Sequence, residues 1–181
     1  MKPGSALAAS LVIGITVGMA PITGNAQYPA GSTSAVLSFI DAGGNQYLLG
    51  TPPGKRLWTV GIKDPDARGH VVGVVETEET SVSTSADSSN FLVANGKKYG
   101  HILDPRTLAP STSALSATVL ARDGTLADAM SKAAFILGPR AGLELVDSFP
   151  GMSAVIAYRM GDGSVGVAIS PRLLRAYRPT A

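Results

Sequence analysis

The sequence has no cysteine among its 181 residues. This absence excludes a disulfide scaffold, a zinc site built on thiolates, an iron–sulfur cluster and a cysteine nucleophile. Charged residues are also scarce, at 15% of the chain against about 25% in typical domains. The formal net charge is +2, from 15 Lys and Arg against 13 Asp and Glu, and no dense basic patch is present. We therefore expect no nucleic-acid partner.

Long hydrophobic runs are missing as well. The longest apolar stretch, residues 6–20, contains two glycines and is shorter than the roughly 20 residues that a transmembrane helix needs. It follows Lys2 and precedes Pro21 and a small residue at position 26, which is the pattern of a secretory signal peptide. We expect residues 1–26 to be a cleaved signal and the mature chain to have no transmembrane segment. An ordinary buried segment is the alternative, and a lipid anchor is not expected without a cysteine.

The rest of the composition is typical of one globular domain. Hydrophobic residues make up 45% of the chain, and its 21 Gly and 12 Pro indicate many turns between short strands. Residues 27–34 are expected to form a linker and residues 171–181 a partly frayed basic tail. Hydrophobic runs and alternation predict strands at 35–40, 46–49, 57–62, 71–75, 91–94, 98–103, 115–121, 154–158 and 165–169.

Two segments differ from this strand pattern. Residues 81–90 are almost entirely Ser, Thr, Ala and Asp, and we expect a polar loop whose hydroxyls and amides suit a phosphate. Apolar residues then recur every three to four positions after Thr125, the expected N-cap, until Gly138 and Pro139 stop the helix. A second short helix is expected over 139–147. The prediction is an α+β fold with a strand-rich, mostly antiparallel sheet and a helical hairpin.

Five motifs carry a resemblance to a known family. They are DAGGN at 41–45, WTVGIKDP at 58–65, STSAD at 83–87, GKKYGHILDPRT at 96–107, and TLADAM at 125–130 continuing to LGP at 137–139. In this order and spacing they resemble the ApbE-like FAD:protein FMN transferases. The resemblance implies an ApbE-like, T-fold-like domain over residues 35–170 that corresponds to the later half of the family domain. Family members are commonly exported, which favours the bacterial periplasm.

The resemblance also implies an activity. The family moves FMN from FAD, its substrate, onto a Thr or Ser of a target flavoprotein subunit with Mg²⁺, and releases AMP. Attack on a diphosphate needs charge neutralisation, a base and hydrogen-bond donors. Carried over to this sequence, the family's roles are Asp128 and Ser131 as metal ligands, His101 as the base, and Ile102, Thr84 and Ser85 as contacts to the flavin nucleotide. A histidine suits the base because imidazole titrates near neutral pH.

Three motifs depart from the family pattern. Lys132 stands where the family often has a Thr ligand one helical turn after Asp128. A protonated lysine cannot bind a metal, so Lys132 either weakens the metal site or replaces the metal. Ala86 stands in a loop where the family usually has Gly. Leu108 stands at another usual Gly position, where a positive φ would strain it.

Two other functions stay open. The chain could be a truncated, non-catalytic remnant of the family that binds flavin or a partner chain, or, without any resemblance, a small secreted β-rich binding protein. Because half of a domain exposes core-facing strands and sheet edges, we also expect self-association or pairing with a missing first half.

Overall fold

The computed structural model describes residues 38–52, 54–86, 91–94 and 96–180. The predicted signal peptide and linker, residues 1–34, lie outside these ranges. Within them, no helix is long and apolar enough to cross a membrane.

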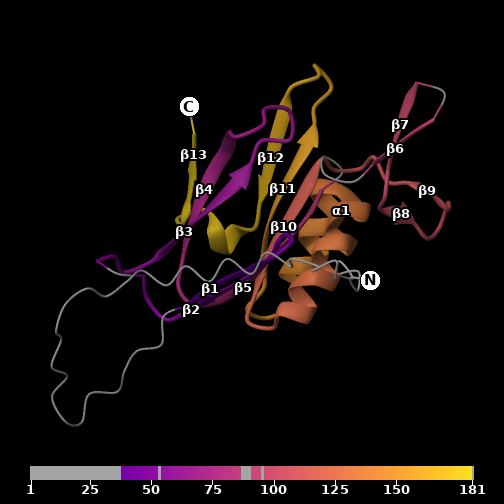
Figure 1. The fold of residues 1–181 in the computed structure, drawn as a ribbon. Coiled ribbons are helices and arrows are strands. Elements are labelled where there is room, and N and C mark those ends of the chain that lie inside the picture. Colours follow the sequence, from indigo (N-terminus) through magenta and orange to yellow (C-terminus); the bar gives the residue numbers. More distant parts are fainter. Residues whose placement is uncertain (1–37, 53, 87–90, 95, 181) are drawn as a thin grey trace, which may run out of the picture.

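Two antiparallel sheets and a helical element with a break inside it form the body of the protein (Figure 1). The main sheet has the order β1-β2-β5-β10-β11-β12, with bounds Ser38–Ala42, Asn45–Leu49, Thr80–Ala86, Ser116–Ala121, Ser153–Arg159 and Val165–Ile169. The second sheet has the order β13-β4-β3, with bounds Tyr177–Pro179, Val71–Thr77 and Trp58–Lys63. The helix α1 spans Gly124–Asp147, and a short 3-10 helix, η1, spans Pro171–Leu173. The α+β prediction is confirmed.

The main sheet is the middle layer of three, with α1 on one face and the second sheet on the other (Figure 1). Alternation along β10 explains how one strand serves both layers. Ala117 and Val119 pack in the cluster beneath α1, where Phe135 is fully buried. Leu120 joins the cluster between the two sheets, together with Val75 of β4. The predicted alternation of β3 is confirmed in the same way.

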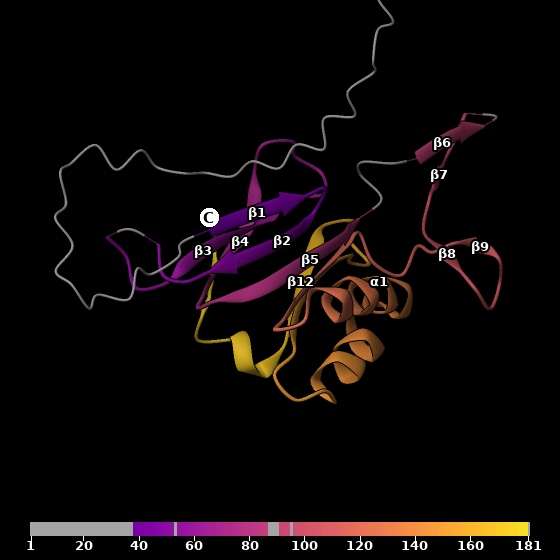
Figure 2. The same cartoon turned by 60° about the horizontal axis from the view of Figure 1, so that its bottom comes forward.

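Two small hairpins extend away from the body, beyond α1 (Figures 1 and 2). The first pairs β6 (Phe91–Ala94) with β7 (Lys97–Gly100), as the sequence predicts. The second pairs β8 (Leu103–Asp104) with β9 (Ala109–Pro110). Leu108, in the turn of the second hairpin, has φ +57°, so the expected strain at this non-glycine residue is confirmed.

The expectation of a polar loop from residue 81 is wrong for the residues that are described. Residues 80–86 form β5, which pairs with both β2 and β10 inside the main sheet. Its hydroxyls are hydrogen-bonded by neighbouring elements: Thr84 Oγ1 lies 2.9 Å from Thr118 Oγ1, and Ser83 Oγ donates to Asn45 Oδ1 at 2.5 Å. Because these partners are distant in sequence, composition alone could not reveal them. Residues 87–90 lie outside the described residues.

The helix prediction needs one correction. Its N-cap is Asp123 rather than Thr125, because the Asp123 carboxylate accepts from the Leu126 backbone N–H at 3.0 Å. The predicted stop at Gly138 is confirmed as a break within α1, where Gly138 has φ +79° and ψ −173°. The chain then resumes a helical course to Asp147.

The expected fraying of the C-terminal tail is also wrong. β13 adds to the second sheet by pairing with β4, and the Tyr177 hydroxyl donates to the Val72 carbonyl at 2.9 Å. A position for the tail on a neighbouring strand cannot be read from its basic composition.

Candidate functional site

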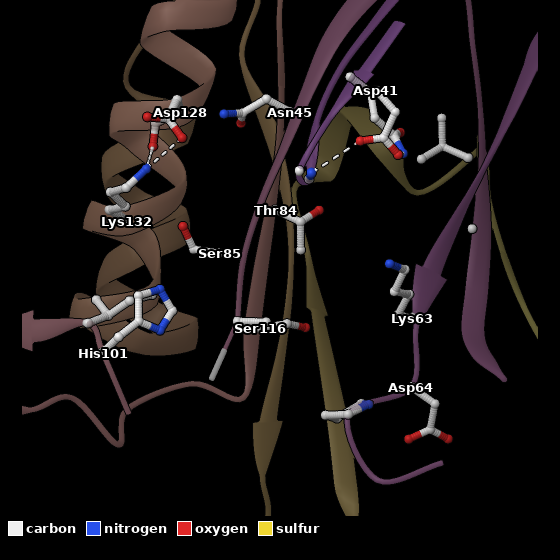
Figure 3. A pocket seen from close by; sticks show the side chains of 18 residues that line it. Asp41, Asn45, Lys63, Asp64, Thr84, Ser85, His101, Ser116, Asp128 and Lys132 are labelled. Carbon is white, nitrogen blue, oxygen red and sulfur yellow. Dashed lines mark hydrogen bonds and ion pairs between the residues drawn. The ribbon is translucent and has the colours of Figure 1, made fainter. Parts of the chain in front are cut away.

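A cavity of about 720 Å³ opens at one end of the main sheet (Figure 3). Its walls come from the β1–β2 turn, the end of β3, the end of β5, the segment after β7, the start of β10 and the first turns of α1. Six segments therefore meet around one space, and all but the start of β10 contain residues of one of the five motifs.

The β1–β2 turn is built on two glycines. Gly43 and Gly44 have φ +67° and +100°, a region that side chains rarely adopt. The Asp41 carboxylate closes the turn by accepting from the Gly44 N–H at 3.2 Å, and the Gly44 carbonyl accepts from the Thr84 N–H at 3.1 Å. This turn places Asn45 next to Ser83 of β5.

Asp128 and Lys132 form an ion pair on the cavity side of α1 (Figure 3). Lys132 Nζ donates to Asp128 Oδ1 at 2.5 Å and to the Asp128 backbone carbonyl at 3.4 Å. Ser83 Oγ lies 3.4 Å from the same carboxylate oxygen. The hydrogen bond and charge of Lys132 hold the pKa of Asp128 below its usual value, and hydrogen bonds from Asn45 and Ser83 act in the same direction against partial burial. The Asp128 side chain is 40% exposed and is supported on its other side by Lys132, Asn45 and Ser83.

Ser131 faces the interior of the protein. It is fully buried, its hydroxyl donates to the Asp128 carbonyl at 2.9 Å, and it lies 2.8 Å from Ser85 Oγ and 3.2 Å from Ser83 Oγ. It is not among the residues that line the cavity. The hydroxyl thus joins α1 to the central strand β5.

His101 and Ile102 reach the cavity from the segment that follows β7. His101 is exposed at the cavity wall, whereas Ile102 is buried and also belongs to the apolar cluster beneath α1. Thr84 and Ser85 line the wall formed by β5. The cavity thus brings together His101, Ile102, Thr84, Ser85 and Asp128, which the resemblance had implied, but not Ser131.

Lys63 is a cavity residue that the sequence analysis did not single out. It ends β3 at an irregularity of pairing: Ile62 pairs with Gly73 and Lys63 with Val71, which leaves Val72 as an extra residue. Such bulges redirect the neighbouring side chains. No ion pair involves Lys63 among the described residues. Its position in the WTVGIKDP motif could have indicated a place in the site. A lysine at the end of a strand is ordinarily exposed to solvent, however, and so does not by itself suggest a functional role.

The groups around Asp128 do not fit the Mg²⁺ that the resemblance implies. Magnesium needs several oxygen ligands in octahedral geometry, and within the described ranges no group of three or more His, Cys, Asp or Glu side chains could hold a metal ion. The Ser131 hydroxyl is committed to internal hydrogen bonds, and the Asn45 oxygen accepts from Ser83. The Lys132 ammonium group already neutralises the carboxylate.

Comparisons with known proteins agree with the five motifs. The model of the ApbE family matches residues 32–156. A FAD:protein FMN transferase of Treponema pallidum (strain Nichols) is 34% identical over 151 residues, which cover 77% of this chain and 42% of that protein. Another from Rhodobacter capsulatus is 36% identical over 109 residues, covering 60% of this chain and 20% of that protein.

Solved structures show the same relationship. The ApbE protein of Thermotoga maritima MSB8 superposes with a TM-score of 0.65 at 33% identity, covering 78% of this chain and 45% of that one. The chain spans less than half the length of these relatives.

Proposed function

Because this chain belongs to the ApbE family, we propose that it serves FAD:protein FMN transfer, the reaction for which its relatives are named. FMN would pass from FAD to a Thr or Ser hydroxyl of a target flavoprotein, and AMP would leave. The observation that carries this proposal is that one cavity is lined by His101, by Thr84 and Ser85 at the end of β5, and by Lys63 and Lys132.

The step balances without any change of oxidation state. The acceptor oxygen attacks the phosphorus on the FMN side of the diphosphate and forms a new P–O bond. The bond from that phosphorus to the bridging oxygen breaks, and AMP leaves with this oxygen. The hydroxyl proton passes to the imidazole of His101, which lies at the cavity wall where an incoming side chain has access. No part of this step uses Mg²⁺, since the donor groups at Asp128 do not suit it.

The test is FMN transfer by the full chain. FAD is mixed with a Thr-containing acceptor protein, and FMN attachment and AMP release are followed by flavin fluorescence and chromatography. Replacing His101 with Gln should slow transfer by roughly 10²-fold or more, the usual contribution of a general base. His70→Gln is the matched control, because His70 is exposed and does not line the cavity. Equal rates in both variants would contradict the role of His101.

A binding-only function is the second candidate, and the Lys132–Asp128 ion pair favours it. This pair occupies the place where the resemblance puts a catalytic metal. A protein that binds FAD but forms no AMP with any acceptor would support this second function.

Two further proposals come from sequence alone. Export to the periplasm depends on residues 1–26 and predicts that the exported protein begins near Gln27 on N-terminal sequencing. Self-association, or pairing with a first half, predicts that light scattering will increase more than linearly with concentration.

A further inference from the structure

We infer that the cation of this site is the ammonium group of Lys132, and that the cavity holds a diphosphate between Lys132 and Lys63 without a divalent metal. This inference deepens the proposed function and rests on it for the identity of the ligand, a flavin nucleotide with two linked phosphates. It assigns to the N–H donors of two lysines the phosphate contacts that a metal would otherwise provide.

The position of Lys132 is the first observation. Its Nζ is held by the carboxylate and the backbone carbonyl of Asp128, at 2.5 Å and 3.4 Å. An ammonium group has three N–H donors, so one donor stays available beyond these two acceptors. The Lys132 side chain is 51% exposed, and the residue lines the cavity. The ammonium group is therefore fixed by the protein on one side and open to a ligand on the other.

The support behind Asp128 is the second observation. Ser83 Oγ lies within 3.4 Å of Asp128 Oδ1 and donates more closely to Asn45. Both groups also help to keep the carboxylate ionised. A carboxylate supported by hydrogen bonds is suited to hold an ammonium group in place, whereas a metal would need several further oxygen ligands.

Lys63 is the third observation. It reaches the cavity from β3, on the side of the cavity opposite α1, so the two lysines lie on different walls (Figure 3). A diphosphate carries negative charge on two phosphate groups, so two separated ammonium groups can each donate to one of them. The other carboxylates of the cavity have donors of their own: Asp41 accepts from the Gly44 N–H and from Gln46 Nε2, and Asp64 accepts from the N–H groups of Asp66 and Ala67.

The first part of the test measures metal binding without any measurement of activity. Mn²⁺ is titrated into the full chain and free Mn²⁺ is followed by electron paramagnetic resonance. The unmodified chain should bind no Mn²⁺ at this site, whereas Lys132→Thr, which removes the ammonium group and adds a hydroxyl, should gain a site that Asp128→Asn abolishes in the same background. Mn²⁺ binding by the unmodified chain that is lost in Asp128→Asn would overturn the inference.

The second part measures FAD affinity by calorimetry, in EDTA and in Mg²⁺. The unmodified chain should bind FAD equally in both. Lys132→Thr and Lys63→Gln should each weaken binding in EDTA by roughly tenfold or more, the usual effect of losing one charged hydrogen bond. Lys55→Gln, an exposed lysine outside the cavity, should leave binding unchanged. Affinity that requires Mg²⁺, or that is insensitive to both cavity lysines, would overturn the inference.

The two parts separate this inference from the proposed function. If only Lys132→Thr binds Mn²⁺ and FAD binds without metal, the inference stands even where no FMN is transferred. If FMN is transferred only with Mg²⁺ bound at Asp128, the function stands and the inference fails. Circular dichroism of each variant establishes that it is folded before either part is carried out.

Discussion

The hydroxyl of Ser131 on α1 lies 2.8 Å from the hydroxyl of Ser85 on β5, and both residues are buried. The helix is thus joined to the central strand by a hydrogen bond as well as by apolar packing. Removing the Ser131 hydroxyl leaves the hydroxyl of Ser85, a residue that is only 6% exposed at the cavity wall, without this partner. That arrangement assigns Ser131 a structural role, which stability measurements can test.

We expect Ser131→Ala to lower the free energy of unfolding by about 1–3 kcal/mol, the cost of leaving a buried polar group unpaired. Urea denaturation measures this change. Ser148→Ala is the control, because the Ser148 hydroxyl bonds to the Leu145 carbonyl at an exposed helix end. A surface change of this kind should alter stability by less than about 0.5 kcal/mol. If Ser131→Ala were as stable as the unmodified chain, the structural role would be wrong.

Leu108→Gly should stabilise the protein. Leu108 has φ +57° and the residue is 79% exposed, so the substitution relieves backbone strain and removes little packing. Left-handed backbone costs an L-residue about 1–2 kcal/mol, and added freedom of the unfolded glycine offsets part of this gain. A net increase of about 0.5–1 kcal/mol is expected. Thermal unfolding should show a higher midpoint, whereas Leu103→Gly, in the strand β8 of the same hairpin, should lower it.

Gly142 should tolerate no side chain. A Cβ added there would lie 2.7 Å from the Ala134 carbonyl oxygen and 3.0 Å from Ile156 Cδ1. The second half of α1 therefore approaches both the first half and the main sheet closely. We expect Gly142→Ala to cost about 1–3 kcal/mol by overpacking, as measured by chemical denaturation. Gly161→Ala, where a Cβ would meet no atom within 4 Å, should have little effect, and similar losses in the two variants would contradict the close approach.

The ion pair between Asp104 and Arg106 predicts a pH dependence. Hydrogen bonds from the Arg106 side chain and backbone lower the pKa of Asp104 from 3.8 to about 2. Because the folded pKa lies below the unfolded one, the pair stabilises the fold above about pH 4, and this contribution is lost as the pH falls toward 2. Carbon-13 NMR of the carboxyl group should give a titration midpoint near 2. In Arg106→Ala the midpoint should move up toward 3.8, and an unchanged midpoint would refute the assignment to Arg106.

Local patterns predicted most elements of the fold. The alternation around Val60 and Ile62 indicated β3, and the three-to-four-residue repeat around Met130 indicated α1, because each pattern reports one buried face of one element. Prediction failed at β5, where buried serines take the place of apolar residues. Their hydroxyls are satisfied by partners more than 30 residues away, such as Ser83 by Asn45 and Ser85 by Ser131.

Residue types at fixed spacing were enough to establish the family, the antiparallel α+β fold and the motifs that meet at the cavity. How the side chains of those motifs are used became clear only from their contacts in the folded protein. The spacing of Asp128, Ser131 and Lys132 along one helix could not reveal that Ser131 turns inward to β5 while Lys132 pairs with Asp128 at the cavity. Nor could β3 alone reveal that Lys63 lines the same space. A side chain's role depends on which distant groups satisfy its charge and hydrogen bonds, and only folding brings those groups together.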